Sequence, residues 1–164
     1  MGKGKKKKPA KEPDGIQRIA ENRRARHDYA ISDTVEAGIS LLGTEVKSLR
    51  AGQVHFEDAF ALIEGGECFL MNLKIDPWKY GTHGNHEPTR RRKLLLHAKE
   101  IDKLSRATRE RGFTVVPLKM YFKKGWAKVL LGVAKGKTDV DRRQDIKKRD
   151  ADRDVQRALR GRGR

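Results

Sequence analysis

FTVVPLKMYFKKGWAKVLLGVA, residues 113–134, carries the clearest fold signal in this sequence. Its two halves are rich in Val, Phe, Tyr and Trp, which favour strands, and Lys124-Gly125 separates them as a tight turn does. Pro117 has no backbone N–H to donate, so it indicates a sheet edge or a bulge in the first strand. The segment therefore predicts an antiparallel hairpin with strands at 113–123 and 126–134.

Two further strand signals lie upstream. Residues 59–63 and 68–73 flank a pair of glycines, which supply the positive φ angles that a tight hairpin turn requires. Apolar residues at alternate positions between 29 and 41 predict a half-buried strand pair, with its bend at 32–34. Because no regular β-α-β alternation appears, we expect a small closed or partly open antiparallel barrel rather than an α/β sheet.

Three helices are predicted around these strands. The first, 16–26, ends in a dense basic cluster. The second starts at Gly43-Thr44, with Thr44 as its N-cap. The third follows from apolar residues that recur at helical spacing from Leu94 to Thr108, with Gly112 as its C-terminal stop.

The charge of the chain is concentrated at its ends. It has 39 basic and 22 acidic residues in 164, a net charge of +17, which favours phosphate partners because each contact releases condensed counterions. Residues 1–14 hold six lysines and no large apolar side chain, which predicts a disordered basic arm. Residues 135–164 carry charges of both signs and predict a basic tail, disordered alone and helical on a partner. One folded domain, 15–134, lies between them.

The sequence argues against several other classes of protein. No stretch approaches the roughly 20 apolar residues of a membrane-spanning helix, so we expect a cytoplasmic protein without a membrane partner. Cys68 is the only cysteine, which excludes an internal disulfide and a thiolate zinc cluster. We therefore expect Cys68 to be a buried thiol in a strand.

Motifs for catalysis or metal binding are weak. The loop predicted at 75–88 contains His83 and His86, but its glycines and prolines leave no helix to pair them. GVAKGKT, residues 132–138, resembles a P-loop with three residues instead of four between its glycines, and we read it as a flexible hinge with phosphate-contacting lysines. Without a persuasive nucleophile or set of spaced carboxylates, an RNA-directed enzyme is the minority hypothesis. No metal or cofactor is expected.

The stronger functional signal is the run NRRARHDY, residues 22–29. Its arginines offer forked donors for phosphates, and their planes together with His27 and Tyr29 can stack on unpaired bases. Three arginines within four positions also repel one another unless an anion is near. The run therefore indicates a surface for structured RNA with exposed bases.

Five blocks of the sequence occur in the order and spacing of a known family. They are NRRARHDY at 22–29, EAGI at 36–39, GTEVKSLRAG at 43–52, RKLLLH at 92–97 and GVAKGK at 132–137. Together they resemble the SmpB family of SsrA-binding proteins over about residues 16–149. The resemblance implies a mainly β fold, a small OB-type antiparallel β-barrel with about three flanking helices and a C-terminal tail that folds on binding.

The resemblance also implies a function without catalysis. Proteins of this family bind the tRNA-like domain of transfer-messenger RNA (SsrA) and deliver it to stalled ribosomes for trans-translation, in which the nascent chain is tagged and the ribosome is released. The protein body substitutes for a missing anticodon arm. The tail enters the empty message channel, where it becomes helical.

Binding residues follow from the same resemblance. The transfer-messenger RNA surface would comprise Asn22, Arg23, Arg24, Arg26, His27, Glu36, Leu95 and Lys128. In it, arginines meet phosphates, Glu36 accepts from base or ribose donors, and Leu95 packs on an unstacked base. Small-subunit ribosomal RNA, at the decoding centre and along the message channel, would contact Lys135, Gly136, Lys137, Asp141, Arg142, Arg143, Ile146 and Lys147. Val140 departs from the family, which often has an aromatic residue or histidine able to stack there.

A ribosome-associated structural RNA-binding protein is the alternative hypothesis, because it would share the basic arm and the induced helix. Selectivity separates the two, since a structural protein would co-purify with ribosomal subunits independently of transfer-messenger RNA. We expect a monomer in either case.

Overall fold

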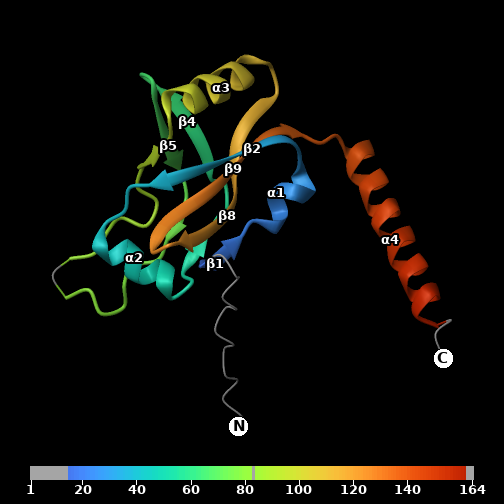
Figure 1. Ribbon diagram of the computed structural model, residues 1–164, viewed down its shortest axis with the longest axis horizontal. Coiled ribbons are helices and arrows are strands. Elements are labelled where there is room, and N and C mark those ends of the chain that lie inside the picture. The colour runs from blue at the N-terminus through green and yellow to red at the C-terminus, as the bar shows by residue number, and fades with distance from the viewer. Residues whose placement is uncertain (1–14, 83, 162–164) are drawn as a thin grey trace, which may run out of the picture.

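The computed structural model describes residues 15–82 and 84–161, and in them it forms nine strands and four helices (Figure 1). The strands are β1 (Ile16–Glu21), β2 (Tyr29–Ile39), β3 (Val54–His55), β4 (Phe60–Glu64), β5 (Glu67–Met71), β6 (Lys74–Ile75), β7 (Arg92–Leu95), β8 (Phe113–Lys123) and β9 (Trp126–Gly136). The helices are α1 (Arg23–Asp28), α2 (Gly43–Arg50), α3 (Ala98–Arg109) and α4 (Asp139–Gly161). The mainly β, antiparallel fold predicted from the sequence is confirmed. The basic arm predicted for residues 1–14 lies outside the described residues.

Six strands pair in a ring. From β8 the pairing passes through β4, β5, β7, β2 and β9 and returns to β8, and every ladder is antiparallel. The β4–β8 junction is one residue pair, Ala61 with Val115, so backbone hydrogen bonding closes the barrel least at this point. β1 extends the sheet from the other half of the same β8 edge.

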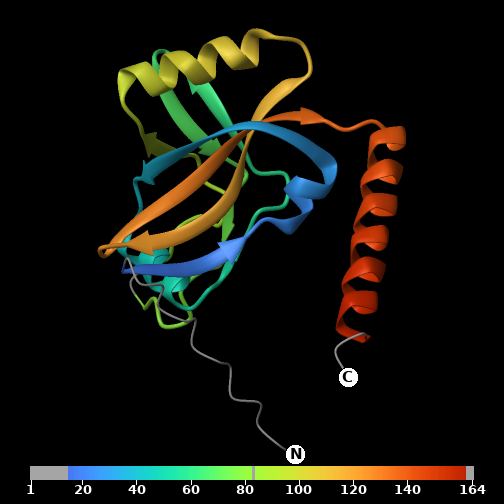
Figure 2. The ribbon, with the colours of Figure 1, turned by 45° about the vertical axis from the view of Figure 1, so that its right-hand side comes forward.

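The helices occupy different sides of the barrel. α3 lies at one end and α2 at the opposite end, while α1 links β1 to β2 on the flank (Figures 1 and 2). These three are the flanking helices expected from the sequence. α4 stands away from the barrel, and nearly all of its side chains are exposed.

The hairpin of β8 and β9 is confirmed. Lys124 and Gly125 form its turn, both with positive φ, at 50° and 83°. The register of the ladder shifts between Pro117 and Lys119, which is the bulge that the proline indicated. The β4–β5 hairpin is confirmed as well, with two positive-φ glycines between its strands.

β2 differs from its prediction. The alternating apolar residues form one continuous strand of 11 residues rather than a strand pair. At the position expected for the bend, the register against β9 shifts between Ile31 and Asp33. A bulge turns the direction of a strand without ending it, so the polar run at 32–34 marks a bulge instead of a turn.

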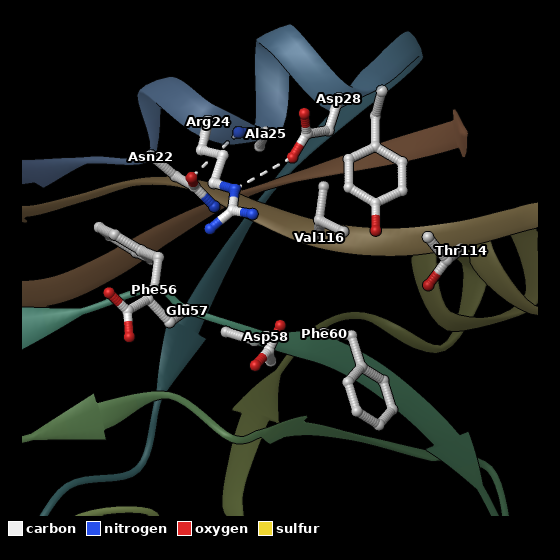
Figure 3. Close-up of a pocket in the computed structure, with 12 residues that line it drawn as sticks. Asn22, Arg24, Ala25, Asp28, Phe56, Glu57, Asp58, Phe60, Thr114 and Val116 are labelled. Carbon is white, nitrogen blue, oxygen red and sulfur yellow. Dashed lines mark hydrogen bonds and ion pairs between the residues drawn. The ribbon is translucent and has the colours of Figure 1, made fainter. Parts of the chain in front are cut away.

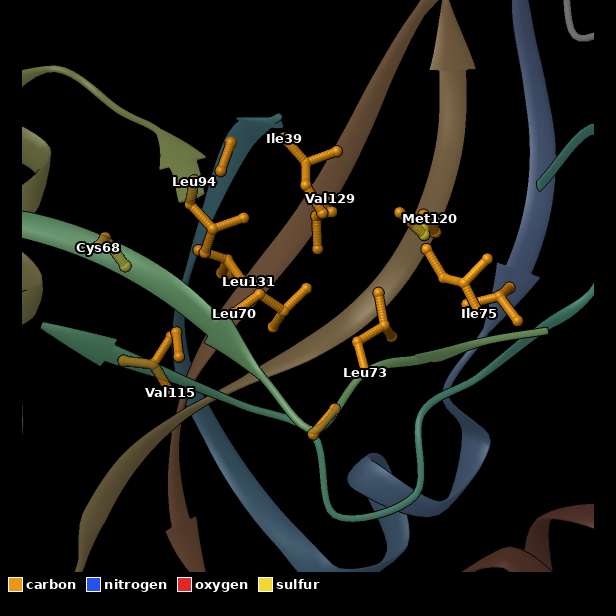
Figure 4. Packing of buried hydrophobic residues seen from close by; sticks show 14 of the residues in the cluster. Ile39, Cys68, Leu70, Leu73, Ile75, Leu94, Val115, Met120, Val129 and Leu131 are labelled. Atoms are coloured by element: carbon orange, nitrogen blue, oxygen red, sulfur yellow. The ribbon is translucent and has the colours of Figure 1, made fainter. Parts of the chain in front are cut away.

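The hydrophobic core fills the ring (Figure 4). Leu70, Met120, Val129 and Leu131 are fully buried there and come from β5, β8 and β9. Cys68 is also fully buried in β5, as expected, and burial raises the pKa of its thiol to about 11. The thiol therefore stays protonated and packs as a small apolar group.

The helix predicted for 16–26 is wrong in its first half, which is strand β1. Ile16, Ile19 and Ala20 follow helical spacing, but the register against β8 shifts between Arg18 and Ala20. This bulge brings Ile19 and Ala20, neighbours in sequence, into contact with the core. An irregular strand therefore imitated a helical pattern. The basic part of the segment does form a helix, α1.

The third helix is confirmed, but its predicted start is wrong. Leu94 and Leu95 lie in β7, where the first is buried and the second is 56% exposed, as alternation in a strand requires. α3 begins at Ala98, because the backbone N–H of His97 donates to the Glu100 carboxylate at 2.8 Å and caps the helix. A run of three leucines fits either periodicity.

α2 is present, but Thr44 is not its N-cap. The N-cap is Leu42, whose backbone N–H donates to Glu45 Oε2 at 2.7 Å. Thr44 Oγ1 lies 2.9 Å from His86 Nδ1, and His86 Nε2 lies 2.9 Å from the carbonyl oxygen of Ile75. His86 thus links α2 to β6, and both of its ring nitrogens have a protein partner.

Glu45 is the centre of a buried ion network. Its side chain is fully buried and accepts from Arg90 Nη2 at 2.6 Å and from Arg92 Nε at 2.8 Å, and Arg92 is fully buried too. Burial alone would raise the pKa of Glu45, but hydrogen bonds from Arg90, the Leu42 N–H and Arg92 hold it below its ordinary value. The basic run at 90–93 is therefore partly structural, which its sequence did not indicate.

The C-terminal region begins later than predicted. Lys135 and Gly136, assigned to the tail from the sequence, are the last residues of β9, and residues 132–136 of the expected hinge are strand. Thr138 and Asp141 cap α4 reciprocally, since the Thr138 hydroxyl donates to Asp141 Oδ2 at 2.7 Å and accepts from the Asp141 N–H at 3.3 Å. α4 then runs for 23 residues.

Candidate nucleic-acid interface

The N-terminal basic cluster is presented by α1. Asn22 caps this helix, because its Oδ1 accepts from the Ala25 N–H at 3.0 Å while its Nδ2 donates to the carbonyl of Pro117 at 3.0 Å. Ala25 is buried against β8 and β9, so the remaining side chains of the helix point outward. Asn22 therefore positions the cluster, and its amide keeps one N–H and one oxygen lone pair for a further contact.

Two members of the cluster are tethered to Asp28. Arg24 Nε donates to Asp28 Oδ2 at 3.2 Å, and His27 Nδ1 lies 2.8 Å from Asp28 Oδ1. These contacts, with His27 contributing most, lower the pKa of Asp28. Within the described residues, Arg23 and Arg26 form no side-chain ion pair, and both are exposed. The cluster thus offers two side chains held by Asp28 and two exposed arginines without an ion pair among the described residues.

A hollow of about 450 Å³ separates α1 from the segment before β4 (Figure 3). Arg24 and Asp28 line it on one side, and Glu57 and Asp58 line it on the other. Three carboxylates around one hollow disfavour phosphate, so an RNA backbone would follow the outer face of α1 instead. Among the described residues, no group of three or more His, Cys, Asp or Glu side chains could hold a metal ion.

A second concavity, which we call the β2–α3 groove, collects the other predicted residues. It has a volume of about 910 Å³ and lies between β2, β7, β9 and the start of α3. Glu36, Leu95 and Lys128 all line it, although they are 33 to 92 positions apart in the chain. An acceptor, an exposed apolar side chain and a cation therefore share one surface.

Glu36 is held in place by β8. Its Oε2 accepts from the Tyr121 hydroxyl at 2.5 Å, and Lys123 Nζ lies 3.3 Å from both carboxylate oxygens. The Tyr121 hydrogen bond is the main reason that the pKa of Glu36 is lowered, with Lys123 and Lys128 adding to it, while burial opposes it. The pKa of Tyr121 is raised, by burial and by the same bond. Glu36 is therefore an ionised acceptor with fixed orientation.

Tyr121→Phe is expected to raise the pKa of Glu36 toward its ordinary value of 4.5. A carboxyl whose pKa is lower in the folded than in the unfolded protein stabilises the fold at pH values above the unfolded pKa, and this stabilisation is lost as the pH falls through the folded pKa. The free energy of unfolding of the variant should therefore change less with pH in the acid range. The free energy of unfolding near pH 7 should fall by about 1 kcal/mol, after allowance for solvent screening. Carboxyl chemical shifts followed against pH measure the change.

Tyr29→Phe is the matched control for that prediction. Tyr29 also lies at the surface, at the far end of β2 from Glu36, beside α1. Its replacement should leave the pKa of Glu36 where it is. An unchanged Glu36 titration in Tyr121→Phe would contradict the assigned role of the hydroxyl.

The junction between barrel and α4 is ordered by Lys137. Its backbone N–H donates to the carbonyl of Asp28 at 2.9 Å, and its Nζ donates to the carbonyl of Arg26 at 3.1 Å and to Asp145 Oδ2 at 2.5 Å. Lys135 Nζ lies 5.5 Å from the ring centre of Phe113. The basic cluster on α1 and the root of the tail therefore meet at one place.

α4 presents the remaining predicted residues along an exposed helix. Asp141 belongs to the cap, and Arg142 Nη1 lies 3.2 Å from Asp139 Oδ1, so both have structural contacts. The others are exposed side chains that point into solvent: Arg143, Ile146 and Lys147. Val140, Val155 and Leu159 are also more than half exposed. The described part of the chain does not cover this amphipathic helix.

The structure thus divides the predicted RNA residues between two places. Glu36, Leu95 and Lys128 gather in the β2–α3 groove, and the arginines lie on α1, with β2 joining the two. Sequence reasoning missed Tyr121 and Lys123, which orient Glu36. The period-two alternation of β8 could have placed both on the face opposite Met120 and Phe122, but no sequence signal pairs them with β2.

None of the helices in the described part of the chain is long and apolar enough to cross a membrane.

Comparison with known proteins gives concordant results. The family model described as SmpB protein matches residues 19–161. The SsrA-binding protein of Geobacillus sp. (strain WCH70) is 56% identical over 144 residues, which cover 88% of this chain and 93% of that protein. The SsrA-binding protein of Bacillus subtilis (strain 168) is 53% identical over 142 residues, covering 87% and 91%.

A solved structure agrees with these relatives. A chain from the structure described as "tmRNA-SmpB: a journey to the center of the bacterial ribosome" is 52% identical and superposes with a TM-score of 0.64. The match covers 77% of this chain and 93% of that chain.

Proposed function

This chain belongs to the SmpB protein family, and on that premise we propose that it binds the tRNA-like domain of transfer-messenger RNA and acts with it on stalled ribosomes. The protein is an RNA-binding partner in trans-translation and not an enzyme. Its place of action is the cytoplasm, where ribosomes work, and it acts as a monomer.

The observation that carries the proposal is the β2–α3 groove. Glu36 is ionised and fixed there, so it can accept two hydrogen bonds from base or ribose donors. The net charge of the protein is +17, and a carboxylate on its RNA-binding surface repels phosphate. The fixed position of Glu36 in the groove therefore supports recognition of a base or a ribose. Lys128 supplies a cation and Leu95 an apolar contact in the same groove.

The α1 cluster extends this surface toward phosphates. Arg23 and Arg26 are exposed and form no ion pair among the described residues, which suits backbone contacts that carry no sequence information. Arg24 and His27 are held by Asp28, so their contacts to RNA would depend more on the position of the RNA groups than those of Arg23 and Arg26. In this proposal the groove provides selectivity and the arginines provide most of the salt-dependent affinity.

The tail serves the ribosomal step. α4 is basic, exposed and attached by Lys137 beside the α1 cluster, so RNA bound to the barrel leaves it accessible. We propose that Arg143, Ile146 and Lys147 contact small-subunit ribosomal RNA along the message channel, with Lys135, Gly136, Lys137, Asp141 and Arg142 at its entrance. Val140 is exposed but cannot stack on a base as an aromatic residue would.

Binding selectivity tests the proposal. The full chain is titrated with the isolated tRNA-like domain of transfer-messenger RNA, with ordinary transfer RNA and with duplex RNA, at two salt concentrations. We expect the tRNA-like domain to bind tightest and to keep its preference at the higher salt, because hydrogen bonds in the groove are not counterion-driven. Glu36→Gln should weaken that binding, whereas Glu64→Gln, at an exposed glutamate that is not among the residues lining the groove, should not.

Equal affinity for all three RNAs, collapsing together with salt, would contradict the proposal. That result would favour the second candidate, a structural RNA-binding protein of the ribosome. Co-purification with ribosomal subunits from cells that lack transfer-messenger RNA would then identify it.

A further inference from the structure

A third concavity lies next to the β2–α3 groove and shares lining residues with it. It has a volume of about 520 Å³, its lining is mostly apolar, and Trp126 is one of the lining residues. The residues that line it are Gly38, Ile39, Ser40, Leu41, Val46, Leu95, Phe122, Gly125, Trp126, Ala127 and Lys128. The Trp126 side chain is 75% exposed, the largest exposed fraction among the large hydrophobic residues of the described chain. We call this concavity the Trp126 surface.

The two concavities share part of their lining. Gly38, Leu95 and Lys128 line both of them. A Cβ on Gly38 would lie 3.2 Å from the Cβ of Leu95, so the missing side chain lets Leu95 lie across β2 between the two spaces. A molecule that contacts Leu95 and Lys128 from the β2–α3 groove therefore reaches the edge of the Trp126 surface.

The backbone position of Trp126 is set by the β8–β9 hairpin. It is the first residue of β9, paired with Lys123 in the ladder, and follows the tight turn at Lys124 and Gly125. Within the described residues, its indole stacks on no other aromatic ring, unlike Trp78, whose ring centre lies 5.6 Å from that of Tyr80. A large, mostly exposed aromatic ring without an aromatic partner among the described residues therefore borders this surface.

The charges around this surface select its occupant. Lys128 is the one charged residue in the lining, and Lys123 and Lys124 precede Trp126 on the hairpin. The lining contains no carboxylate. A mostly apolar lining with Lys128 in it and Lys124 beside it on the hairpin fits a nucleobase with its attached phosphate, because the base stacks on the indole and the phosphate meets an ammonium group. Lys123 is already paired with Glu36.

We propose that the indole of Trp126 stacks on an unpaired base of the bound RNA, and that Lys128 binds the phosphate next to this base. The inference rests on the proposed function, since it extends the same RNA surface by one nucleotide beyond Glu36 and Leu95. Trp126 is then a recognition residue that distinguishes RNA with a flipped-out base from a continuous duplex.

Trp126→Ala tests the stacking contact, with the tRNA-like domain of transfer-messenger RNA as probe. Base–aromatic stacking is worth about 1–3 kcal/mol, so the affinity should fall about tenfold. Trp126→Phe keeps a ring and should lose about threefold or less. Tyr80→Ala removes an aromatic side chain that is 69% exposed on a loop elsewhere and should change nothing.

The salt dependence separates stacking from ion pairing. Trp126 carries no charge, so Trp126→Ala should leave the slope of log affinity against log salt as it is. Lys128→Ala should reduce that slope by about one phosphate contact. Melting temperatures close to that of the unmodified protein are expected for Trp126→Ala, because the side chain is mostly exposed.

Fluorescence gives a direct readout. The chain has two tryptophans, so Trp78→Phe leaves Trp126 as the sole indole emitter. Its emission should be quenched saturably by the tRNA-like domain, with the same midpoint as binding measured by filter retention. Duplex RNA without unpaired bases should quench it little at equal occupancy.

Three results would overturn the inference and leave the proposed function intact: unchanged affinity in Trp126→Ala, equal losses in Trp126→Ala and Trp126→Phe, or unaltered emission at RNA saturation. Normal RNA binding combined with defective tagging in Trp126→Ala would mean that the surface meets a protein instead, which also overturns it. Failure of the unmodified protein to prefer the tRNA-like domain would refute the proposed function itself.

Discussion

Glu45→Gln is expected to lower the free energy of unfolding by about 3–5 kcal/mol, which is a large share of the stability of a single domain. The carboxylate is the counterion of Arg92, and both side chains are fully buried. Glutamine keeps the shape of the side chain but leaves the guanidinium charge uncompensated in the interior. The melting temperature should fall on the order of 10 °C, measured by calorimetry.

The geometry of Arg92 explains the size of this effect. Besides Glu45, its guanidinium donates to the carbonyls of Leu73 at 2.5 Å, Pro88 at 2.9 Å and Arg90 at 3.1 Å. These bonds fasten the long loop before β7 to the barrel. An uncompensated Arg92 charge would therefore loosen the loop as well as α2, because the same side chain holds both.

The network also predicts an acid dependence. The pKa of Glu45 is depressed in the folded protein, so its stabilising contribution is complete above the unfolded pKa and is lost as the pH falls through the folded value. Below about pH 4.5, the ordinary value for this carboxyl, the unmodified protein should therefore lose stability faster than Glu45→Gln does.

Glu64→Gln is the matched control. Glu64 also pairs with an arginine, Arg91, at 2.7 Å, but both side chains are largely exposed. Exposed pairs contribute about 0–1 kcal/mol, so this variant should melt close to the unmodified protein. If Glu45→Gln and Glu64→Gln had the same melting temperature, the buried network would not be a major source of stability.

Removal of residues 139–164 is expected to abolish tagging of nascent chains on stalled ribosomes while leaving affinity for the tRNA-like domain within about twofold. α4 is almost entirely exposed and makes one ion pair to the barrel side, Asp145 with Lys137. The shortened chain keeps the Lys137 backbone bond to Asp28, so the α1 cluster stays in place. Reconstituted translation of a message without a stop codon measures tagging.

Deletion of residues 2–14 is the charge-matched control for that experiment. The removed tail holds ten basic and six acidic residues and the N-terminal segment holds six and two, so each deletion removes a net charge of +4. Tagging should survive the N-terminal deletion if the tail acts by its position rather than by its charge. A parallel loss of RNA binding and tagging in the tail deletion would contradict the division of labour.

The sequence by itself determined the parts of this protein that depend on short-range chemistry. Positive-φ residues fixed both hairpin turns, Pro117 marked a bulge, and apolar residues at helical spacing marked most of α3. The blocks that resemble the SmpB family also contain three residues, Glu36, Leu95 and Gly38, that later meet in space. Local rules suffice where the partners of a residue lie within one or two turns.

Only the tertiary structure decided what depends on partners distant in sequence. Ile16 to Ala20 follow helical spacing, and they form a strand because the edge of β8 offers backbone hydrogen bonds that a short isolated helix cannot match. In the sequence, nothing distinguishes Arg92 from the basic residues beside it. Its burial depends on the ion pair with Glu45, 47 positions away. Trp126 lies near Leu95 only because β2 pairs with β9 on one side and with β7 on the other. Such contacts depend on strand order, and strand pairing across a ring leaves no periodic signal in the sequence.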